Sequence, residues 1–466
     1  MLIRAAEIEP GQMVDLRIVD GVIAEIGAAL QAAPDEEVIE AHANAVLPGL
    51  HDHHLHLRAL AAARASVRCG PPQVRTLEQL AAALRAAAAM LAPGEALRGV
   101  GYHESVAGEL DREQLDVLLP DRPLRIQHRS GRLWIFNSAA LDALAPDADA
   151  PLERRDGRWN GRLLDADDWL SARLRRRLPS LQSVSRYLAS RGVTGVTDTT
   201  HHNGPEALQA FMQARARGEL LQGLRVMGDA RLHGQGEGPG VQCGELKFHL
   251  HEHALPDWDG LLAALRIGHA QGRASAFHCV TRAELVYALA ALREVGPQHG
   301  DRIEHAAITP PESLDEIAAL GLTVVTQPNF IAERGDDYRR DVDAEDQPWL
   351  YRLRGFVTAG VPLALSTDAP FGEPDPWVAM QAAVQRRTPS GIALGAQEAL
   401  RPEEALAGFL APLAHPGAPP RRLVVGADAD LCLLDRPRAA ALADLSAVGV
   451  RLTLVAGRAA WRTAGV

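Results

Sequence analysis

The stretch VLPGLHDHHLHL, residues 46–57, decides how this 466-residue chain is interpreted. Five of its residues are apolar, and its second half is rich in histidine. Side chains at i and i+2 of a β-strand point to the same face, so His54 and His56 would present two imidazoles side by side. Such a pair suits a zinc-type ion, which prefers nitrogen ligands. Taken alone, the pair also fits a polar strand end. Further candidate ligands elsewhere in the chain are needed to distinguish a metal site from this alternative.

The central part of the chain alternates strand signals with Ala/Leu-rich helical segments such as 77–91 and 283–295. Apolar strands are expected at 45–57, 97–105, 192–202, 244–253, 273–280, 301–306, 322–331 and 362–370. Repeated β-α units predict a parallel sheet. Each segment ends in polar residues, as in a (β/α)8 barrel, where the carboxyl ends of the strands form the active site. The predicted fold class is therefore α/β, a distorted (β/α)8 TIM barrel.

Both ends of the chain predict short strands, which we expect to pair in one small β-sandwich. The predicted domains are a composite sandwich of residues 1–47 and 418–466 and a barrel of residues 48–417. Residues 106–190 hold more than a single connecting helix, including LRIQHRS (124–130) and LWIFNSAAL (133–141), and are expected to be an insertion in the barrel. The charged segment 333–349 is expected to be a solvated loop rather than a lid.

Composition restricts the function. Hydrophobic residues make up 47% and charged residues 23% of the chain, as in globular proteins with a large core. A net charge of −11 argues against nucleic acid or an anionic membrane as the partner. No apolar run is long enough to span a membrane, and no secretory signal is evident. The four cysteines form no CxxC pair and predict free thiols in a reducing compartment, so the expected location is the cytoplasm.

The chain has 48 basic residues besides histidine, but only one of them, Lys247, is a lysine. A bias toward arginine explains the other 47 but does not explain the exception. Arginine stays charged, whereas lysine can lose its proton where a neutral amine is needed. Lys247 is therefore a candidate for chemistry.

Three more candidates lie near strand ends at regular distances from Lys247. His278 follows it by 31 residues, His305 follows His278 by 27, and Asp368 follows His305 by 63 with one expected strand between them. One β-α unit of a barrel averages about 31 residues. Each of the two later histidines alone could be a hydrogen-bonded residue at a strand end. Together with His54 and His56 they predict a metal site.

These segments resemble the amidohydrolase superfamily of metal-dependent hydrolases, and within it the amidohydrolase-3 (YtcJ-like) branch. The resemblance covers nearly the whole chain. The residues 46–57 resemble the first-strand HxH signature, GELKFHL (244–250) the fourth-strand lysine segment, and AFHCVTRAEL (276–285) and DRIEHAAI (301–308) the fifth- and sixth-strand histidine segments. The eighth-strand aspartate segment is resembled by residues 349–377.

The resemblance implies a role for each residue. His54 and His56 would bind one metal with Asp368, and His278 and His305 would bind a second. Lys247, carboxylated by CO2, would bridge the two ions, since a carbamate is an anionic oxygen ligand. The expected cofactor is a divalent metal, zinc by preference, with one or two ions per chain. Lys247 and Asp368 would be the catalytic residues, and Asp368 would carry a proton to the leaving nitrogen. A homodimer is also implied.

The expected reaction is hydrolysis of a C–N bond in a small molecule by metal-bound hydroxide, the bond lying in an amide, N-substituted formamide, N-acyl amino acid or cyclic amide. Two alternatives stay open: a mononuclear deaminase of an aminoheterocycle with Lys247 uncarboxylated, and a non-catalytic scaffold.

Substrate contacts are predicted for four residues. His249 and His251 share the alternation of Lys247, His202 ends an earlier strand, and Arg129 lies in the insertion.

Overall fold

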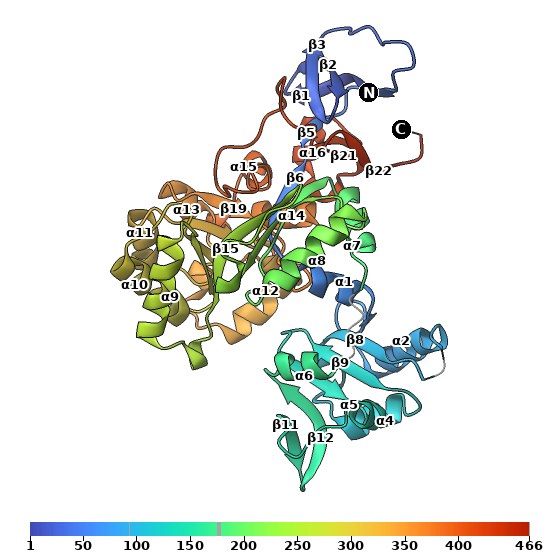
Figure 1. Ribbon diagram of the computed structural model, residues 1–466, viewed down its shortest axis with the longest axis vertical. Helices are drawn as coiled ribbons and strands as arrows, with labels where there is room; N and C mark the ends of the chain where they lie inside the picture. Colours follow the sequence, from blue (N-terminus) through green and yellow to red (C-terminus); the bar gives the residue numbers. More distant parts are fainter. Residues whose placement is uncertain (93, 175–178, 466) are drawn as a thin grey trace. The chain divides into compact units, whose positions relative to one another are not determined.

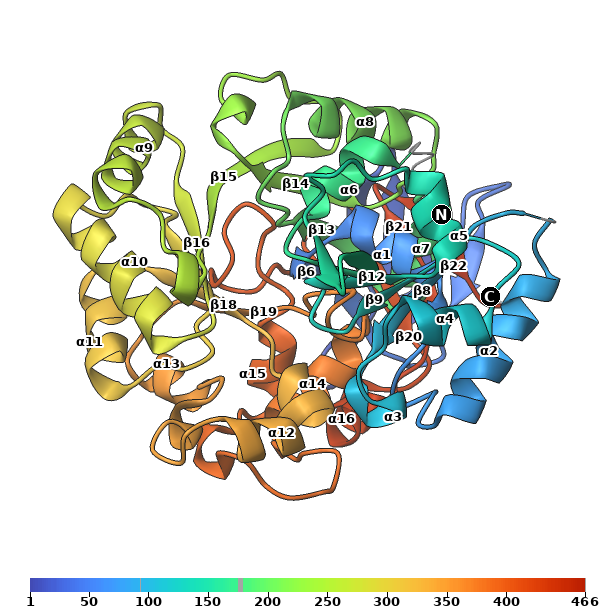
Figure 2. The same cartoon turned by 90° about the horizontal axis from the view of Figure 1, so that it is seen from below.

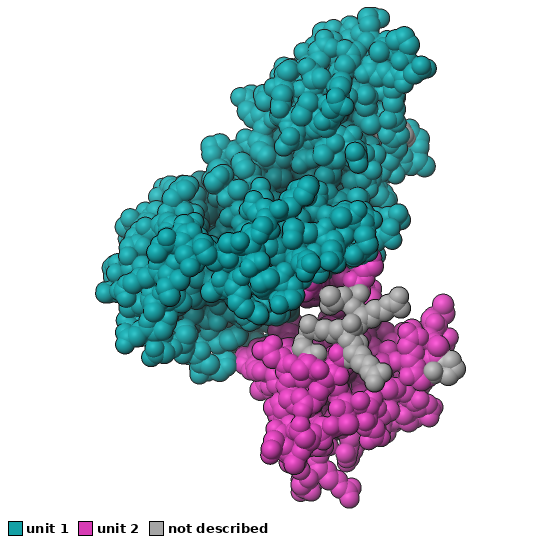
Figure 3. Space-filling model, in the orientation of Figure 1, with its two compact units in different colours: residues 1–57, 181–466 teal, residues 58–180 magenta. Residues whose placement is uncertain are grey.

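The computed structural model describes residues 1–92, 94–174 and 179–465 (Figure 1). Two compact units are distinguished: Met1–Leu57 with Leu181–Val466, and Arg58–Ser180 (Figure 3). In the described part of the chain, no helix combines the length and the apolar character needed to cross a membrane.

The larger unit is built on an eight-stranded parallel sheet. Its strands, in spatial order, are β6 (Leu50–Leu55), β13 (Val193–Asp198), β14 (Gly223–Gly228), β15 (Val241–His249), β16 (Ser275–Cys279), β17 (Arg302–His305), β18 (Thr323–Thr326) and β19 (Leu363–Leu365). A parallel bridge between Leu55 and Ala369 joins the first strand to the segment after the last. The sheet therefore curls into a nearly closed barrel, which confirms the predicted fold class.

Helices cover the outside of the barrel. The helices between the strands are α8 (Pro205–Ala216), α9 (Trp258–Ala270), α10 (Arg282–Val295), α11 (Pro311–Ala319), α12 (Asn329–Asp341) and α13 (Arg354–Thr358), and α14 (Pro376–Gln385) follows the last strand. Figure 2 shows α9, α10 and α11 lying outside strands β15, β16 and β18. Helix α10 begins with a capping box, in which Thr281 and Glu284 bond to each other's backbone N–H groups. Its apolar face packs on Phe277 and Ile303 in one buried core.

The two ends of the chain form the small β-sandwich. One sheet has the order β3 (Val22–Gly27), β2 (Gln12–Val19), β1 (Leu2–Glu9), β4 (Val38–Glu40). The other has the order β22 (Arg458–Arg462), β21 (Val450–Val455), β20 (Leu431–Leu434), β5 (Val46–Pro48). Ile3 and Leu16 of the first sheet share a buried core with Leu433 and Leu452 of the second. Strand β5 leads directly into β6, so the sandwich is tied to the first strand of the barrel.

The smaller unit has its own sheet, in the order β11 (Leu152–Arg155), β12 (Arg158–Leu164), β10 (Leu133–Phe136), β9 (Leu124–His128), β8 (Leu97–Tyr102), β7 (Val67–Arg68). It also contains α2 (Leu77–Ala89), α4 (Arg112–Leu118), α5 (Ser138–Leu144) and α6 (Asp167–Arg173). The expectation that 97–105 is a barrel strand is wrong, because β8 pairs here with β7 and β9. The strand missing from the prediction is β14. The unit starts at Arg58, earlier than residue 106, where the insertion was expected.

The expectation of a loop at 333–349 is also wrong in its first half. Helix α12 continues to Asp341, with Phe330, Ile331 and Gly335 buried. Its charged residues are half-buried from Glu333 to Asp337, and the last three residues of the helix, from Arg339 to Asp341, are exposed. A helix that buries only one face needs few apolar residues, so its sequence can resemble that of a charged loop.

Candidate metal centre

The closure of the barrel places Asp368 beside the histidines of β6. The N–H of Asp368 donates to the His54 carbonyl at 2.9 Å, and the N–H of His56 donates to the Ala369 carbonyl at 2.8 Å. Asp368 has a φ of +54° and His305 a φ of +68°, in the left-handed region. Non-glycine residues rarely adopt this conformation, and they gather where the surrounding structure enforces it, often at active sites.

Three of the predicted ligands form a tight group. The Oδ1 atom of Asp368 lies 3.4 Å from Nε2 of His54 and 3.3 Å from Nε2 of His56. One ligand atom from each of the three residues lies within 4.8 Å of the others. Two ligands held at about 2.1 Å from one ion in a tetrahedral arrangement are separated by similar distances. The group can therefore hold a metal ion.

The other three predicted ligands adjoin this group. The rings of His278 on β16 and His305 on β17 have centres 4.4 Å apart, and the His305 ring is 4.7 Å from that of His54. Lys247 is buried on the neighbouring strand β15. The structure thus brings together residues from five barrel strands or strand ends that are separated by up to 314 positions in the chain.

Three histidines of the cluster are oriented through their Nδ1 atoms. His54 Nδ1 lies 2.5 Å from a Glu304 carboxylate oxygen, His56 Nδ1 lies 3.0 Å from the Thr200 hydroxyl, and His305 Nδ1 lies 2.7 Å from the Gln327 amide oxygen. An Nδ1–H that donates to an oxygen leaves Nε2 unprotonated. Metal-binding histidines are usually held this way, which fixes both tautomer and ring direction.

Sequence analysis missed Glu304, Thr200 and Gln327. Glu304 is fully buried and also accepts a hydrogen bond from the Arg302 guanidinium. A signal for it was present, since Arg302 and Glu304 are two charged residues at i and i+2 on a strand short enough to be wholly buried. Buried charges are rare unless they are paired. Gln327 and Thr200 carry no comparable signal.

Burial and neighbouring charges set the protonation of the cluster. Burial lowers the pKa of the Lys247 amine to about 8, although Glu304 at 4.0 Å opposes this effect. Burial alone would raise the pKa of Asp368, but His54, His56 and His305 together hold it well below its usual value. A lysine that can lose its proton near neutral pH meets the requirement for reaction with CO2. A carboxylate that stays ionised meets the requirement for a metal ligand.

The donor set fits a divalent metal. Within residues 1–92, 94–174 and 179–465, the buried Lys247 Nζ and Asp368 Oδ1 atoms have no hydrogen-bond partner. A buried polar atom without a hydrogen-bond partner lowers the stability of the fold by about 1–3 kcal/mol. A bound ion that interacts with both atoms would remove this cost. Imidazole nitrogen and carboxylate oxygen suit zinc and similar first-row ions.

The predicted substrate contacts are placed unequally. The His249 ring, at the end of β15, is 4.4 Å from the His278 ring, and His251 is 4.4 Å from His249. His202 lies beside His201, with ring centres 4.9 Å apart. Arg129 belongs to the smaller unit, where its N–H donates to the Tyr102 carbonyl.

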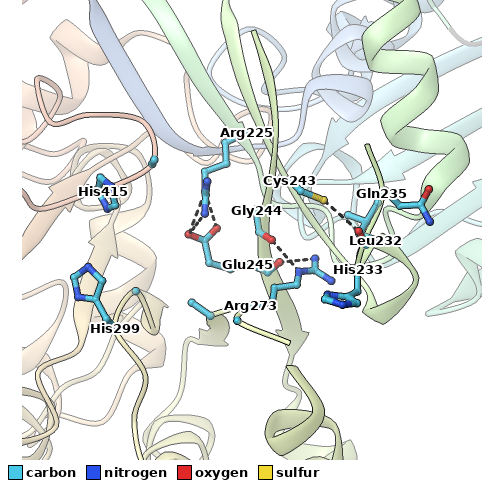
Figure 4. Close-up of a pocket in the computed structure, with 15 residues that line it drawn as sticks. Arg225, Leu232, His233, Gln235, Cys243, Gly244, Glu245, Arg273, His299 and His415 are labelled. Carbon is cyan, nitrogen blue, oxygen red and sulfur yellow. Dashed lines mark hydrogen bonds and ion pairs between the residues drawn. The ribbon is translucent and has the colours of Figure 1, made fainter. Parts of the chain in front are cut away.

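A cavity of about 250 Å³ lies at the amino ends of the same barrel strands (Figure 4). It is lined by Arg225, Glu245, Arg273, Cys243 and three histidines, among other residues. Its charges are satisfied: Arg225 donates to Glu245, and Arg273 donates to the carbonyls of Gly228, Asp229, Gly244 and Glu245. We therefore interpret the residues of this cavity as structural, since their hydrogen bonds link neighbouring strands and loops of the barrel.

A barrel with histidine, lysine and aspartate side chains clustered at the carboxyl ends of its strands is the arrangement expected of a metal-dependent hydrolase. The chain belongs to the amidohydrolase family, whose model matches residues 37–460. It acts on carbon–nitrogen bonds other than peptide bonds, as this family assignment and the site support.

Individual relatives agree with this assignment. The chain is 27% identical to the N-substituted formamide deformylase of Arthrobacter pascens in an alignment 506 positions long, which covers 94% of this chain and 93% of that protein. A metal-dependent hydrolase from Pyrococcus horikoshii OT3 has a TM-score of 0.71 at 19% identity, covering 88% of this chain and 91% of its own. A metal-dependent hydrolase from Pyrococcus furiosus has a TM-score of 0.70 at 20% identity, with coverages of 92% and 97%.

Proposed function

We propose that this chain hydrolyses N-substituted formamides and related small amides at a centre of two zinc ions bridged by carboxylated Lys247. The observation that carries the proposal is the position of the one lysine in the chain: it is buried, has no hydrogen-bond partner among the described residues, and interacts electrostatically with Asp368, His278 and His305. The substrate class is suggested by the similarity to the formamide deformylase, which extends over nearly all of both chains.

The residues that would hold the ions are the six predicted ones. His54, His56 and Asp368 would hold one ion, His278 and His305 the other, and the Lys247 carbamate both. Bound zinc would supply Lewis acidity, which polarises the substrate carbonyl and lowers the pKa of water.

The remaining chemistry belongs to the side chains. Water adds to the carbonyl carbon, and Asp368 accepts the proton that this water gives up. The C–N bond then breaks as Asp368 delivers the proton to the nitrogen, which yields a carboxylic acid and an amine. Glu304 and Gln327 keep the imidazoles of His54 and His305 in place throughout. His249, His251 and His202 are proposed to contact the substrate.

The proposal is tested with a panel of N-alkyl and N-benzyl formamides, acetamides and lactams, on protein purified with zinc and bicarbonate. Release of formate with the matching amine, fastest on the formamides, is the expected result. Faster hydrolysis of acetamides or lactams would show that these compounds, and not the formamides, are the preferred substrate class. No release from any member would contradict the proposal.

One observation favours a second candidate, a mononuclear deaminase. Lys247 lies 4.0 Å from Glu304, an ion pair that a carbamate would break, and His54, His56 and Asp368 alone form the tight group. In that case Lys247 stays an amine, one ion binds per chain, and ammonia is released from an aminoheterocycle. Ammonia release without amide hydrolysis would establish this alternative.

Two further inferences stay proposals. The four cysteines are free thiols in the structure, three of them buried, which fits the proposed cytoplasmic location. A homodimer is proposed from the family resemblance alone, and light scattering would test it.

A further inference from the structure

Five histidines gather at the barrel mouth in addition to the four that we propose as metal ligands. His201 and His202 follow β13, and His249, His251 and His253 end β15 and begin the segment after it. Four of the five are exposed, and His251 is half-buried. The chain has 18 histidines, so more than a quarter of them meet in this one place.

Neighbouring rings among three of these histidines are as close as neighbouring rings in the proposed metal centre. The His249 ring centre is 4.6 Å from that of His201 and 4.4 Å from that of His251. The rings of the proposed centre are separated by 4.4 Å for His278 and His305, and by 4.7 Å for His54 and His305. Exposed histidines add little to the hydrophobic core, so folding alone does not explain a cluster this close.

We propose that His201, His249 and His251 bind an additional divalent ion of the zinc class at the barrel mouth. Imidazole nitrogen is a preferred ligand for zinc and copper. Three protein ligands leave one coordination position for water or for an oxygen of the substrate, as in catalytic zinc sites. The His249 ring is also 4.4 Å from that of His278, so the additional ion would lie next to the proposed centre.

The site closes by side-chain rotation. Among the described residues, the group with all its ligand atoms within 4.8 Å is His54, His56 and Asp368, so the three mouth imidazoles need to turn toward a common point. His201 and His249 are exposed and His251 is half-buried. Exposed side chains exchange rotamers in picoseconds to nanoseconds, which makes this adjustment easy. The inference does not depend on the proposed substrate or on the Lys247 carbamate.

The first test counts zinc ions by equilibrium dialysis and elemental mass spectrometry on the full-length protein. The variants are His201→Ala/His251→Ala and, as the control, His233→Ala, which removes an exposed histidine elsewhere. The double variant is expected to bind one ion fewer per chain than the wild type, and the control the same number. Equal counts in all three proteins would overturn the proposal. Circular dichroism verifies the fold, and His251→Gln replaces the double variant if that variant unfolds.

The second test uses Cu²⁺ as a probe and separates the two sites. A His56→Ala/Asp368→Ala variant lacks two ligands of the proposed centre. It is expected to bind one Cu²⁺ whose electron paramagnetic resonance spectrum shows hyperfine coupling to imidazole nitrogens, and this signal should disappear when His251→Ala is added. A copper signal that is unchanged by His251→Ala would contradict the additional site.

Discussion

The two ends of the barrel strands differ in how their charged groups are satisfied. At the amino ends, Arg225 and Arg273 donate to carboxylate and carbonyl oxygens in the cavity of Figure 4. At the carboxyl ends, Lys247 Nζ and Asp368 Oδ1 are buried without a hydrogen-bond partner in the described residues. At the amino ends of the sheet, the charged side chains of the cavity thus have hydrogen-bond partners. At the carboxyl ends, two buried polar atoms have none within the described residues. Histidines line both ends, so residue type alone does not separate structure from function.

The largest effect is expected from Lys247→Arg. An arginine stays charged and cannot form a carbamate, so activity should fall to background. Lys247→Ala should regain part of its activity with formate or acetate, which can occupy the place of the carbamate. Full activity in Lys247→Arg would mean that this end of the barrel needs no neutral lysine.

Asp368→Asn should have the next largest effect. The amide cannot accept and return the proton, and such proton transfer contributes about 10²–10⁴-fold to the rate. We expect kcat to fall within this range, while KM changes little. Steady-state kinetics on a formamide would check this. A fall in kcat of less than tenfold would assign the proton transfer to another group.

Glu304→Gln should act through His54 rather than on the substrate. Loss of a carboxylate behind a metal-binding histidine costs about 10–100-fold in metal affinity. Competition with a chromophoric chelator measures this affinity. Because Arg302 would lose the nearer of its two carboxylate partners, a lower Tm is also expected. The matched control is Glu294→Gln, which changes an exposed glutamate in helix α10. An unchanged affinity would leave Glu304 a purely structural role.

The smallest effect on activity is expected at the amino ends. Arg273→Met removes the donor to four backbone carbonyls and should lower the free energy of unfolding by roughly 2–3 kcal/mol. The value of kcat/KM for the folded enzyme should stay within about twofold of the wild type, since stability effects away from the site leave folded protein intact. Urea unfolding and kinetics on the same sample would test both. A large fall in kcat/KM with unchanged stability would show that the two ends are coupled.

The sequence was most informative where one residue type has one chemical use. The lone lysine, the HxH pair and the regular spacing of strand ends predicted the fold class and a set of residues that the structure brings together. The assignment of a strand at 97–105 to the barrel failed for a physical reason. Strands β7, β8 and β9 are parallel, with helices between them, and locally resemble the barrel repeat. Strand β14 was missed because its segment, GLRVMG, ends in glycine and is followed by a Gly-rich loop.

Residues that act by contact were harder to predict. Gln327 and Thr200 are ordinary polar residues in the sequence, and their roles depend on which imidazole each one meets across the barrel. The sequence pattern predicted where the strands end. It could not predict which side chains meet across the barrel, because that depends on distances in the folded structure.

The most direct test of the account is the number of metal ions per chain in the His251→Ala background, where the proposed mouth site is absent. Protein reloaded with zinc and bicarbonate would be measured by elemental mass spectrometry, with and without Lys247→Arg. The account predicts about two ions with Lys247 present and at most one with arginine in its place. The same number in both proteins would contradict a bridging Lys247, and no bound metal in either would contradict the metal centre itself.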